Sequence, residues 1–257
     1  MTNNYTIAIT GKGGTGKTTI AGAIVCRLMK SGCTPVLAVD ADPNACLDLV
    51  LGVAVKKTVG QIREESRAAT ANQKSGIAKR KLVEMKITES LVEADNFDLI
   101  AMGRPEGPGC YCYANNLFGD VIKALSGSYP FIVIDNEAGL ENLSRRLVQK
   151  ANLLIMVGDP SQRGIKTIKR LYELACEMGI SYEKLAVFIN LARNESLPDQ
   201  AKNVAREIGA DYLVLLPRDN QLAELGESGE NIRTLPEDNP FLARIAEFLS
   251  DLKLTAS

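Results

Sequence analysis

The sequence predicts an α/β fold with a mostly parallel central sheet covered by helices on both faces. Short β-rich runs alternate with helical patterns along the chain, which is the pattern of parallel strands joined by helices. Polar residues stand at the ends of several of these runs, where ligands bind in parallel sheets. The predicted strands are residues 5–10, 35–40, 97–102, 131–135, 153–157, 185–190 and 212–216.

The length of the chain favours one domain, because 257 residues can bury one sizeable core and single α/β domains commonly reach this length. We therefore expect a single domain over residues 1–257, with a polar, weakly patterned insertion of helix and loop at about residues 56–94. A helix expected at residues 241–254 docks its apolar face on the core, since its opposite face lacks the basic charge of a membrane-binding helix.

The composition argues against several functional classes. Lys and Arg number 30 against 31 Asp and Glu, so the chain has no bulk positive charge that would attract nucleic acid or anionic lipid. Six scattered cysteines, no long apolar run and no leader pattern predict a cytoplasmic protein without nucleic-acid or membrane partners. Histidine is absent, which leaves carboxylate, thiolate and water for proton transfer and metal binding.

A glycine-rich loop joins the first predicted strand to the first predicted helix. Residues 11–18 fit the pattern G-x-x-x-x-G-K-[ST], in the strand-to-helix context that a P-loop NTPase requires. Glycine lets successive backbone N–H groups point at phosphate oxygens, while Lys17 reaches the β- and γ-phosphates and Thr18 ligates Mg²⁺. The residues predicted to bind ATP here are Gly11, Gly13, Gly14, Thr15, Gly16, Lys17, Thr18 and Thr19.

A second lysine in this loop, Lys12, indicates which class of P-loop NTPase the chain resembles. The loop GKGGTGKTT resembles that of the deviant Walker A, or signature-lysine, ATPases, which include MinD, ParA and the nitrogenase iron protein. The resemblance implies a homodimer that encloses ATP between its subunits. In such a dimer Lys12 reaches the phosphates bound by the partner subunit and assists hydrolysis, as an arginine finger does. A solvated loop charge is the alternative interpretation of Lys12.

Two carboxylates, Asp40 and Asp42, stand at the end of the strand at residues 35–40. This strand-end position puts them beside the predicted phosphates. By resemblance to the switch I segment of the same ATPases, Asp42 orients the attacking water and accepts its proton, and Asp40 supports the Mg²⁺ shell. The absence of histidine also favours a carboxylate as the base. A turn built from Asp, Pro and Asn is the alternative.

A third strand-end carboxylate, Asp135, follows an apolar run at residues 132–134, which is typical of a Walker B motif. Asp135 is predicted to hold Mg²⁺ through water, and Gly139 to let the switch II backbone approach the γ-phosphate. Hydrolysis removes this contact, so we expect the loop to relax and the dimer interface to change. Asn190 resembles the asparagine that contacts adenine in these ATPases, with Pro217 packing nearby.

Two cysteines, Cys110 and Cys112, follow the strand at residues 97–102 and precede a helix predicted at residues 115–125. Residues two apart share a face only in extended backbone, so the thiols converge only outside that helix. Proximity to the helix start favours the thiolate form of Cys112. A two-fold dimer brings four such thiolates together, which suits zinc, nickel or an iron–sulfur cluster. Inert buried cysteines or a local redox pair are the alternatives.

The motifs together resemble those of the CooC-type nickel-insertion ATPases. The resemblance rests on GKGGTGKTT, AVDADPN, GCYC, VIDNEAG and the strand that ends at Asn190. It implies Ni²⁺ or Zn²⁺ bound by Cys110 and Cys112 across the dimer. It also implies a nickel enzyme, carbon monoxide dehydrogenase or acetyl-CoA synthase, as the client.

Two other functions stay open at this point. An electron-transfer or iron–sulfur carrier ATPase like the nitrogenase iron protein is one alternative, but that protein carries a cluster cysteine in switch II, which residues 135–140 lack. A MinD- or ParA-like positioning ATPase is the other, and it needs a basic amphipathic tail or a basic patch that the sequence does not show.

Overall fold

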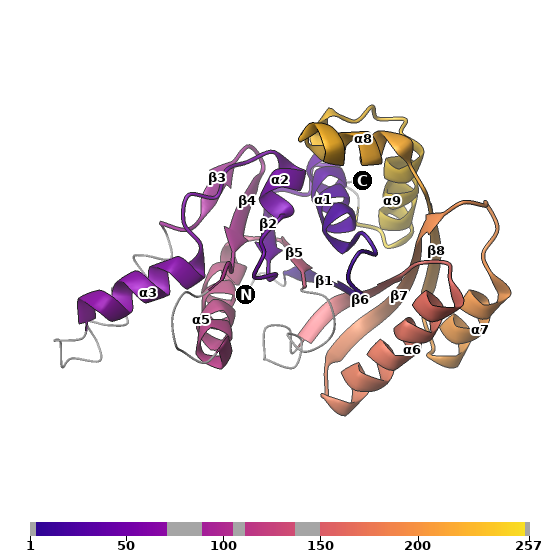
Figure 1. Cartoon of the computed structure of the whole chain (residues 1–257), viewed down its shortest axis with the longest axis horizontal. Coiled ribbons are helices and arrows are strands. Elements are labelled where there is room, and N and C mark those ends of the chain that lie inside the picture. Colours follow the sequence, from indigo (N-terminus) through magenta and orange to yellow (C-terminus); the bar gives the residue numbers. More distant parts are fainter. Residues whose placement is uncertain (1–3, 71–88, 105–110, 137–149, 255–257) are drawn as a thin grey trace.

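Eight strands form one sheet in the computed structural model, which describes residues 4–70, 89–104, 111–136 and 150–254 (Figure 1). The order across the sheet is β3-β4-β2-β5-β1-β6-β7-β8, and all neighbours pair in parallel except the antiparallel β3 and β4. The predicted α/β fold with a mostly parallel sheet is confirmed. The strands are β1 (Tyr5–Gly11), β2 (Val36–Asp40), β3 (Val92–Ala94), β4 (Phe97–Ala101), β5 (Phe131–Asp135), β6 (Lys150–Gly158), β7 (Ser181–Ala192) and β8 (Tyr212–Pro217).

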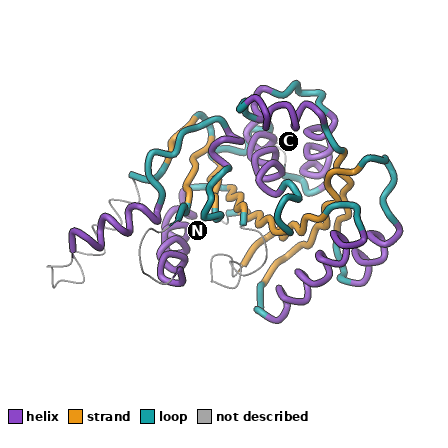
Figure 2. Tube along the Cα trace, viewed as in Figure 1, coloured by secondary structure: helices purple, strands orange, loops and turns teal. Residues whose placement is uncertain are grey.

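Helices cover both faces of the sheet (Figures 1 and 2). Helices α5, α6 and α7 bury apolar side chains against one face, and α1, α2 and α9 against the other. The central strands are therefore apolar on both sides, as parallel strands between two helical layers must be. The helices are α1 (Lys17–Lys30), α2 (Leu47–Leu51), α3 (Val59–Thr70), α5 (Tyr111–Leu125), α6 (Gln162–Glu177), α7 (Asp199–Glu207), α8 (Asn220–Ser228) and α9 (Pro240–Asp251), with 3-10 turns η1 (Ser126–Ser128) and η3 (Ile232–Thr234).

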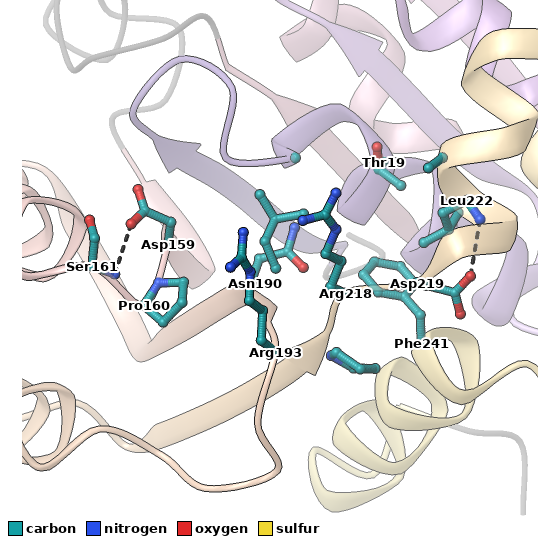
Figure 3. Close-up of a pocket in the computed structure, with 14 residues that line it drawn as sticks. Thr19, Asp159, Pro160, Ser161, Asn190, Arg193, Arg218, Asp219, Leu222 and Phe241 are labelled. Carbon is teal, nitrogen blue, oxygen red and sulfur yellow. Dashed lines mark hydrogen bonds between the residues drawn. The ribbon is translucent and has the colours of Figure 1, made fainter.

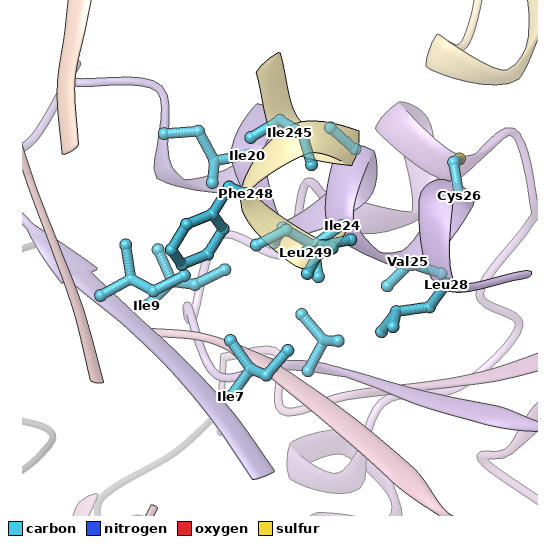
Figure 4. Close-up of a cluster of buried hydrophobic side chains, with 14 of the residues drawn as sticks. Ile7, Ile9, Ile20, Ile24, Val25, Cys26, Leu28, Ile245, Phe248 and Leu249 are labelled. Atoms are coloured by element: carbon cyan, nitrogen blue, oxygen red, sulfur yellow. The ribbon is translucent and has the colours of Figure 1, made fainter. Parts of the chain in front are cut away.

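The C-terminal helix α9 packs against α1 and the sheet. Ile245, Phe248 and Leu249 are buried in one apolar cluster with Ile24 of α1 (Figure 4). The Phe248 ring meets Phe188 of β7 edge-on, with ring centroids 4.9 Å apart. This packing confirms that the apolar face of the predicted helix docks on the core. None of the helices in the described ranges has the length and apolar character needed to cross a bilayer.

Two elements differ from the expectations. Helix α5 begins at Tyr111 rather than at residue 115. Residues 111–113 are poor helix formers, but Phe118 and Val121 bury the same helix in the core, and tertiary packing overrides weak propensity. Within residues 56–94, which were expected to hold helix and loop, α3 is helical but β3 is a short strand at the sheet edge.

Candidate nucleotide-binding site

The phosphate loop runs from the end of β1 into the first turn of α1, and its shape depends on glycine. Gly14 and Gly16 have positive φ values of 77° and 85°, which residues with a Cβ rarely adopt. A Cβ at Gly16 would also lie 2.5 Å from Nδ2 of Asn190. The local sequence therefore dictates both the backbone of the loop and its close approach to β7.

Two side chains hold the loop in its curve. The Thr15 hydroxyl donates to the carbonyl oxygen of Lys12 at 2.8 Å, and the Lys17 ammonium donates to the same oxygen at 3.3 Å. Within the described ranges, no protein carbonyl accepts the backbone N–H groups of Gly13 and Gly14. These donors and the first-turn N–H groups of α1 form the kind of set that binds phosphate. The Lys12 side chain itself is exposed.

The ends of β2 and β5 bring two predicted carboxylates together. Asp40 and Asp135 are register partners on these neighbouring strands, and each is only 1% exposed. The Thr18 hydroxyl is hydrogen-bonded to the Asp135 carboxylate, and the positive charge of Lys17 acts on the same group. Residues 18, 40 and 135 are thus gathered beside Lys17, and their roles at a nucleotide stay predictions.

Burial raises the pKa of both carboxyl groups. It raises the pKa of Asp135 to about 7, and the negative charges of Asp40 and Asp42 raise it as well. The hydrogen bond from Thr18 and the positive charge of Lys17 lower this pKa, but by less than burial raises it. It raises the pKa of Asp40 to about 6, against hydrogen bonds from backbone N–H groups. A cation beside these groups favours their charged forms and so lowers both pKa values.

This cluster fits Mg²⁺, which prefers hard oxygen ligands and retains several waters. The Oδ1 atom of Asp135 is buried and has no hydrogen-bond partner among the described residues. The Thr18 hydroxyl and the carboxylates of Asp40 and Asp135 would hold the ion and its waters. When bound there, the ion supplies charge neutralisation for the phosphates.

Asp42 lies in a tight turn after β2. Its backbone N–H donates to Oδ1 of Asp40 at 3.0 Å, and its own Oδ1 accepts the N–H of Asn44 at 2.8 Å. Ala45 closes the turn with a φ of 42°, a strained conformation for a residue other than glycine. The turn that the sequence offered as an alternative is therefore present. It is compatible with the catalytic role of Asp42, which stays a prediction.

A cavity of about 540 Å³ opens beside the phosphate loop (Figure 3). Gly16 lines it from the loop, Thr19 from the first turn of α1, and Asn190 and Pro217 from the ends of β7 and β8. The Asn190 Nδ2 donates to the carbonyl of Thr15 at 2.9 Å, while its Oδ1 is buried without a partner in the described ranges. A cavity of this size suits a base and ribose next to bound phosphates.

The sequence motifs missed several residues of this site. Thr10 and Asn136 stand at the ends of β1 and β5, and each has a buried side-chain oxygen without a partner among the described residues. Such oxygens are uncommon in proteins, and these two residues adjoin the phosphate loop and Asp135 rather than the cavity. Their strand-end positions could have identified them. Arg218 also lines the cavity, as part of the segment at residues 216–218 that was expected to pack near Asn190, and Arg193 lines it without any sign in the sequence.

The cysteine pair and switch II are only partly described. Cys110 and Gly139 lie outside the described residues, so their roles stay predictions. Cys112 is the second residue of α5, so the expectation that the helix begins after both cysteines is wrong. In the described ranges, no cluster of three or more Cys, Asp and Glu side chains is arranged to hold a metal ion.

Comparison with known proteins shows relatives along the whole chain. Residues 6–232 match the family described as CobQ/CobB/MinD/ParA nucleotide binding domain. The chain is 40% identical over 243 residues to an uncharacterized ATP-binding protein of Methanocaldococcus jannaschii. The aligned region covers 94% of this chain and 95% of that protein. It is also 31% identical over 186 residues to the carbon monoxide dehydrogenase accessory protein CooC of Rhodospirillum rubrum. That aligned region covers 68% of this chain and 70% of the CooC protein.

A solved structure shows the same fold. The MinD cell division protein of Aquifex aeolicus aligns with a TM-score of 0.68 at 21% identity, over 98% of each chain. At this identity the similarity shows a shared fold and does not show a shared partner.

Proposed function

Because this chain belongs to the CobQ/CobB/MinD/ParA nucleotide-binding domain family, we propose that it is a homodimeric ATPase whose hydrolysis cycle controls a metal site at Cys110 and Cys112. The cycle serves the insertion of nickel into carbon monoxide dehydrogenase or acetyl-CoA synthase. One observation carries the ATPase part of the proposal. The phosphate loop, Asp40 and Asp135 meet at one edge of the sheet, with a cavity of nucleotide size beside them.

Each residue of this edge has a proposed role in hydrolysis. Lys17 and the loop N–H groups bind the β- and γ-phosphates, and Thr18 and Asp135 orient the metal shell. Asp42 orients the attacking water and accepts its proton, which a half-buried carboxylate next to the phosphate loop can do. Asn190 and Pro217 contact the adenine in the cavity.

The dimer part of the proposal rests on Lys12. Its side chain is exposed on the phosphate loop, although Lys17 five residues later is buried. An exposed lysine beside bound phosphates is free to reach across an interface and stabilise the charge that develops on a phosphate held by the partner subunit. Such a charge supplied from the other subunit makes turnover depend on dimer formation.

The metal part of the proposal is supported by the cysteine pair and by the similarity to CooC of Rhodospirillum rubrum. Cys110 and Cys112 from two subunits supply four thiolates, which bind soft metal ions tightly. Release of such an ion to a client needs a change in the site. The relaxation of switch II after hydrolysis, through Gly139, provides that change.

A metal titration tests this proposal. Ni²⁺ and Zn²⁺ are added to the full-length protein with and without ATP, and metal per chain and oligomeric mass are measured on the same sample. We expect one metal ion per two chains, lost on Cys110→Ser or Cys112→Ser and retained on Cys176→Ser, a change at an exposed cysteine of α6. If no tight metal binding is found, the metal role is wrong and a general ATP-driven switch remains.

A positioning ATPase is the second candidate, because the description of the family that the chain matches includes MinD and ParA. Sedimentation with anionic lipid vesicles, with and without ATP, separates the two functions. ATP-dependent co-sedimentation that survives the double change Cys110→Ser, Cys112→Ser would favour the positioning role. The burial of the apolar face of α9 leads us to expect no such binding.

A further inference from the structure

One leucine at the end of β7 has a backbone conformation that its own side chain disfavours. Leu191, the residue after Asn190, has a φ of 61°. A Cβ crowds the backbone in this left-handed region, so glycine is the residue that usually occupies it. The presence of leucine at this position therefore needs a physical reason.

The pairing of β7 with β8 explains the backbone conformation but not the side chain. The two strands pair in register at Ile189 and Leu215, and pairing resumes out of step at Ala192 and Pro217. Residues 190–191 of β7 thus lie opposite one residue of β8, which is a β-bulge. A bulge turns side chains in new directions, and glycine would form this one without strain.

Packing in the core does not offset the strain. The Leu191 side chain is 42% exposed, and neither apolar cluster of the described residues includes it. A single exposed leucine is ordinary on a protein surface, as Leu49 of α2 and Leu174 of α6 show, but those two have no positive φ. At Leu191 an exposed side chain and a disfavoured backbone coincide. Strain of this kind is found at functional positions.

The cavity beside the phosphate loop gives the side chain a function. Leu191 lines this cavity together with Asn190, Pro217 and Leu222 (Figure 3). A purine base has two apolar ring faces and a polar edge, so its site needs an apolar wall as well as a hydrogen-bonding group. Asn190 supplies the hydrogen-bonding group, and its amide is anchored to the Thr15 carbonyl. The next residue along the strand supplies an apolar surface.

We infer that Leu191 is a base-binding residue that packs on a face of the adenine ring. The inference rests on the proposed function, because it needs ATP in this cavity. Contact with the ring removes apolar surface of both partners from water, which offsets the cost of the strained backbone when nucleotide is bound. It also explains why a leucine occupies a position that suits glycine.

The test separates the base from the phosphates. Isothermal titration measures the affinity of the full-length protein for a non-hydrolysable ATP analogue and for inorganic tripolyphosphate, which has no base. We expect Leu191→Ala to weaken binding of the analogue about tenfold, because most of the apolar contact is lost. Binding of tripolyphosphate should change less than about twofold, since Leu191 lies outside the phosphate loop.

Two further variants control for general damage. Leu191→Met keeps an unbranched apolar side chain, so we expect it to bind the analogue within about threefold of wild type. Leu174→Ala removes an exposed leucine from α6 and should change neither affinity.

The strain is tested by comparing Leu191→Gly with Leu191→Ala. Glycine is less stable than alanine at ordinary positions of a strand, but at a φ of 61° the order should reverse. We therefore expect the glycine variant to unfold at a higher urea concentration, while both variants lose affinity for the analogue equally. A lower midpoint for Leu191→Gly would overturn the inference, because the leucine would then not be strained.

The outcomes distinguish this inference from the proposed function. If the wild type binds the analogue no more tightly than tripolyphosphate, the proposed base site fails and the inference fails with it. If the wild type prefers the analogue and Leu191→Ala keeps that preference, the proposed function stands and the inference is overturned. Loss of the dimer, measured by mass, without a change in affinity would assign Leu191 to a subunit interface and would also overturn it.

Discussion

At the scale of single residues, the buried Asp135 carboxyl links the site to the stability of the fold. Its pKa in the folded protein is raised to about 7, above the ordinary value of 3.8 for an aspartate side chain. The folded state therefore holds a proton that the unfolded state releases between these two values. The stability that this carboxyl contributes is fully present at low pH, is lost as pH rises from about 4 to about 7, and does not change further above that range.

The change Asp135→Asn removes this pH dependence. Without Mg²⁺ and nucleotide, we expect the variant to be more stable than wild type at pH 8 by on the order of 3 kcal/mol. At pH 4 we expect the two proteins to differ little. Urea unfolding across this pH range measures the difference, with Asp120→Asn at an exposed position of α5 as the control. If the difference in unfolding free energy between variant and wild type does not change with pH, Asp135 does not titrate as described.

Gly16 offers a second test at this scale. Gly16→Ala places a Cβ at a φ of 85° and 2.5 Å from the Asn190 side chain, so we expect ATP affinity to fall at least tenfold or so and stability by about 1–3 kcal/mol. Isothermal titration and urea unfolding measure the two effects. Gly226→Ala in α8, where a Cβ meets nothing within 4 Å, is the matched control and should cost nothing. Equal behaviour of the two variants would refute the steric argument.

At the scale of secondary-structure elements, one buried side chain joins the last two helices. Asn239 caps α9, because its Oδ1 accepts the N–H of Leu242 at 3.1 Å. Its Nδ2 donates to Asp219 at 2.8 Å and to Gln221 at 2.9 Å, both at the start of α8. Asp219 caps α8 and also lines the nucleotide cavity. The packing of α9 is thus linked to the wall of the cavity.

Asn239→Ala should therefore cost more than the loss of an ordinary cap. We expect about 2–3 kcal/mol of unfolding free energy, from one lost cap and two lost, partly buried hydrogen bonds. Ser161→Ala at the start of α6, whose hydroxyl accepts only from Gly164 among the described residues, should cost about 1 kcal/mol. Chemical denaturation of both variants provides the comparison. A smaller loss for Asn239→Ala would mean that the bridge to α8 contributes nothing.

The same scale shows what the sequence could predict. Seven strands were identifiable because each is an apolar run between polar breaks, and Asp40 and Asp135 were identifiable because each ends such a run. The strand β3 has three residues, too few to show an alternating pattern. A hydrogen bond between Asn44 and Arg104 joins two exposed loops, and no local pattern encodes a pairing across 60 positions.

At the scale of the whole molecule, the strand order places the phosphate loop in the middle of the sheet. Strand β1, which ends in the loop, lies between β5 and β6, and β2 lies on the far side of β5. The loop and the strand-end carboxylates therefore lie together at the carboxyl ends of the central strands. This edge of the sheet is the surface that an ATP-enclosing homodimer must bury, with Lys12 exposed upon it.

Lys12→Ala tests this arrangement. We expect ATP-driven dimer formation to be lost and turnover to fall by about a hundredfold or more, as for the loss of a charge supplied from a partner subunit. Light scattering for mass and a phosphate-release assay provide the two measurements. Lys56→Ala, at an exposed position before α3, is the control. Normal turnover by the Lys12 variant would show that this lysine has no role in trans.

The fixed orientation of one amide has a consequence for which purine this protein accepts. One N–H of the Asn190 amide donates to the Thr15 carbonyl, which fixes the orientation of the amide and leaves its oxygen as the acceptor for the proposed contact with a base. The six-position of adenine carries a donating amino group, whereas that of guanine carries an accepting carbonyl. A buried acceptor facing a carbonyl leaves both oxygens unpaired, so GTP and ITP should compete poorly with ATP.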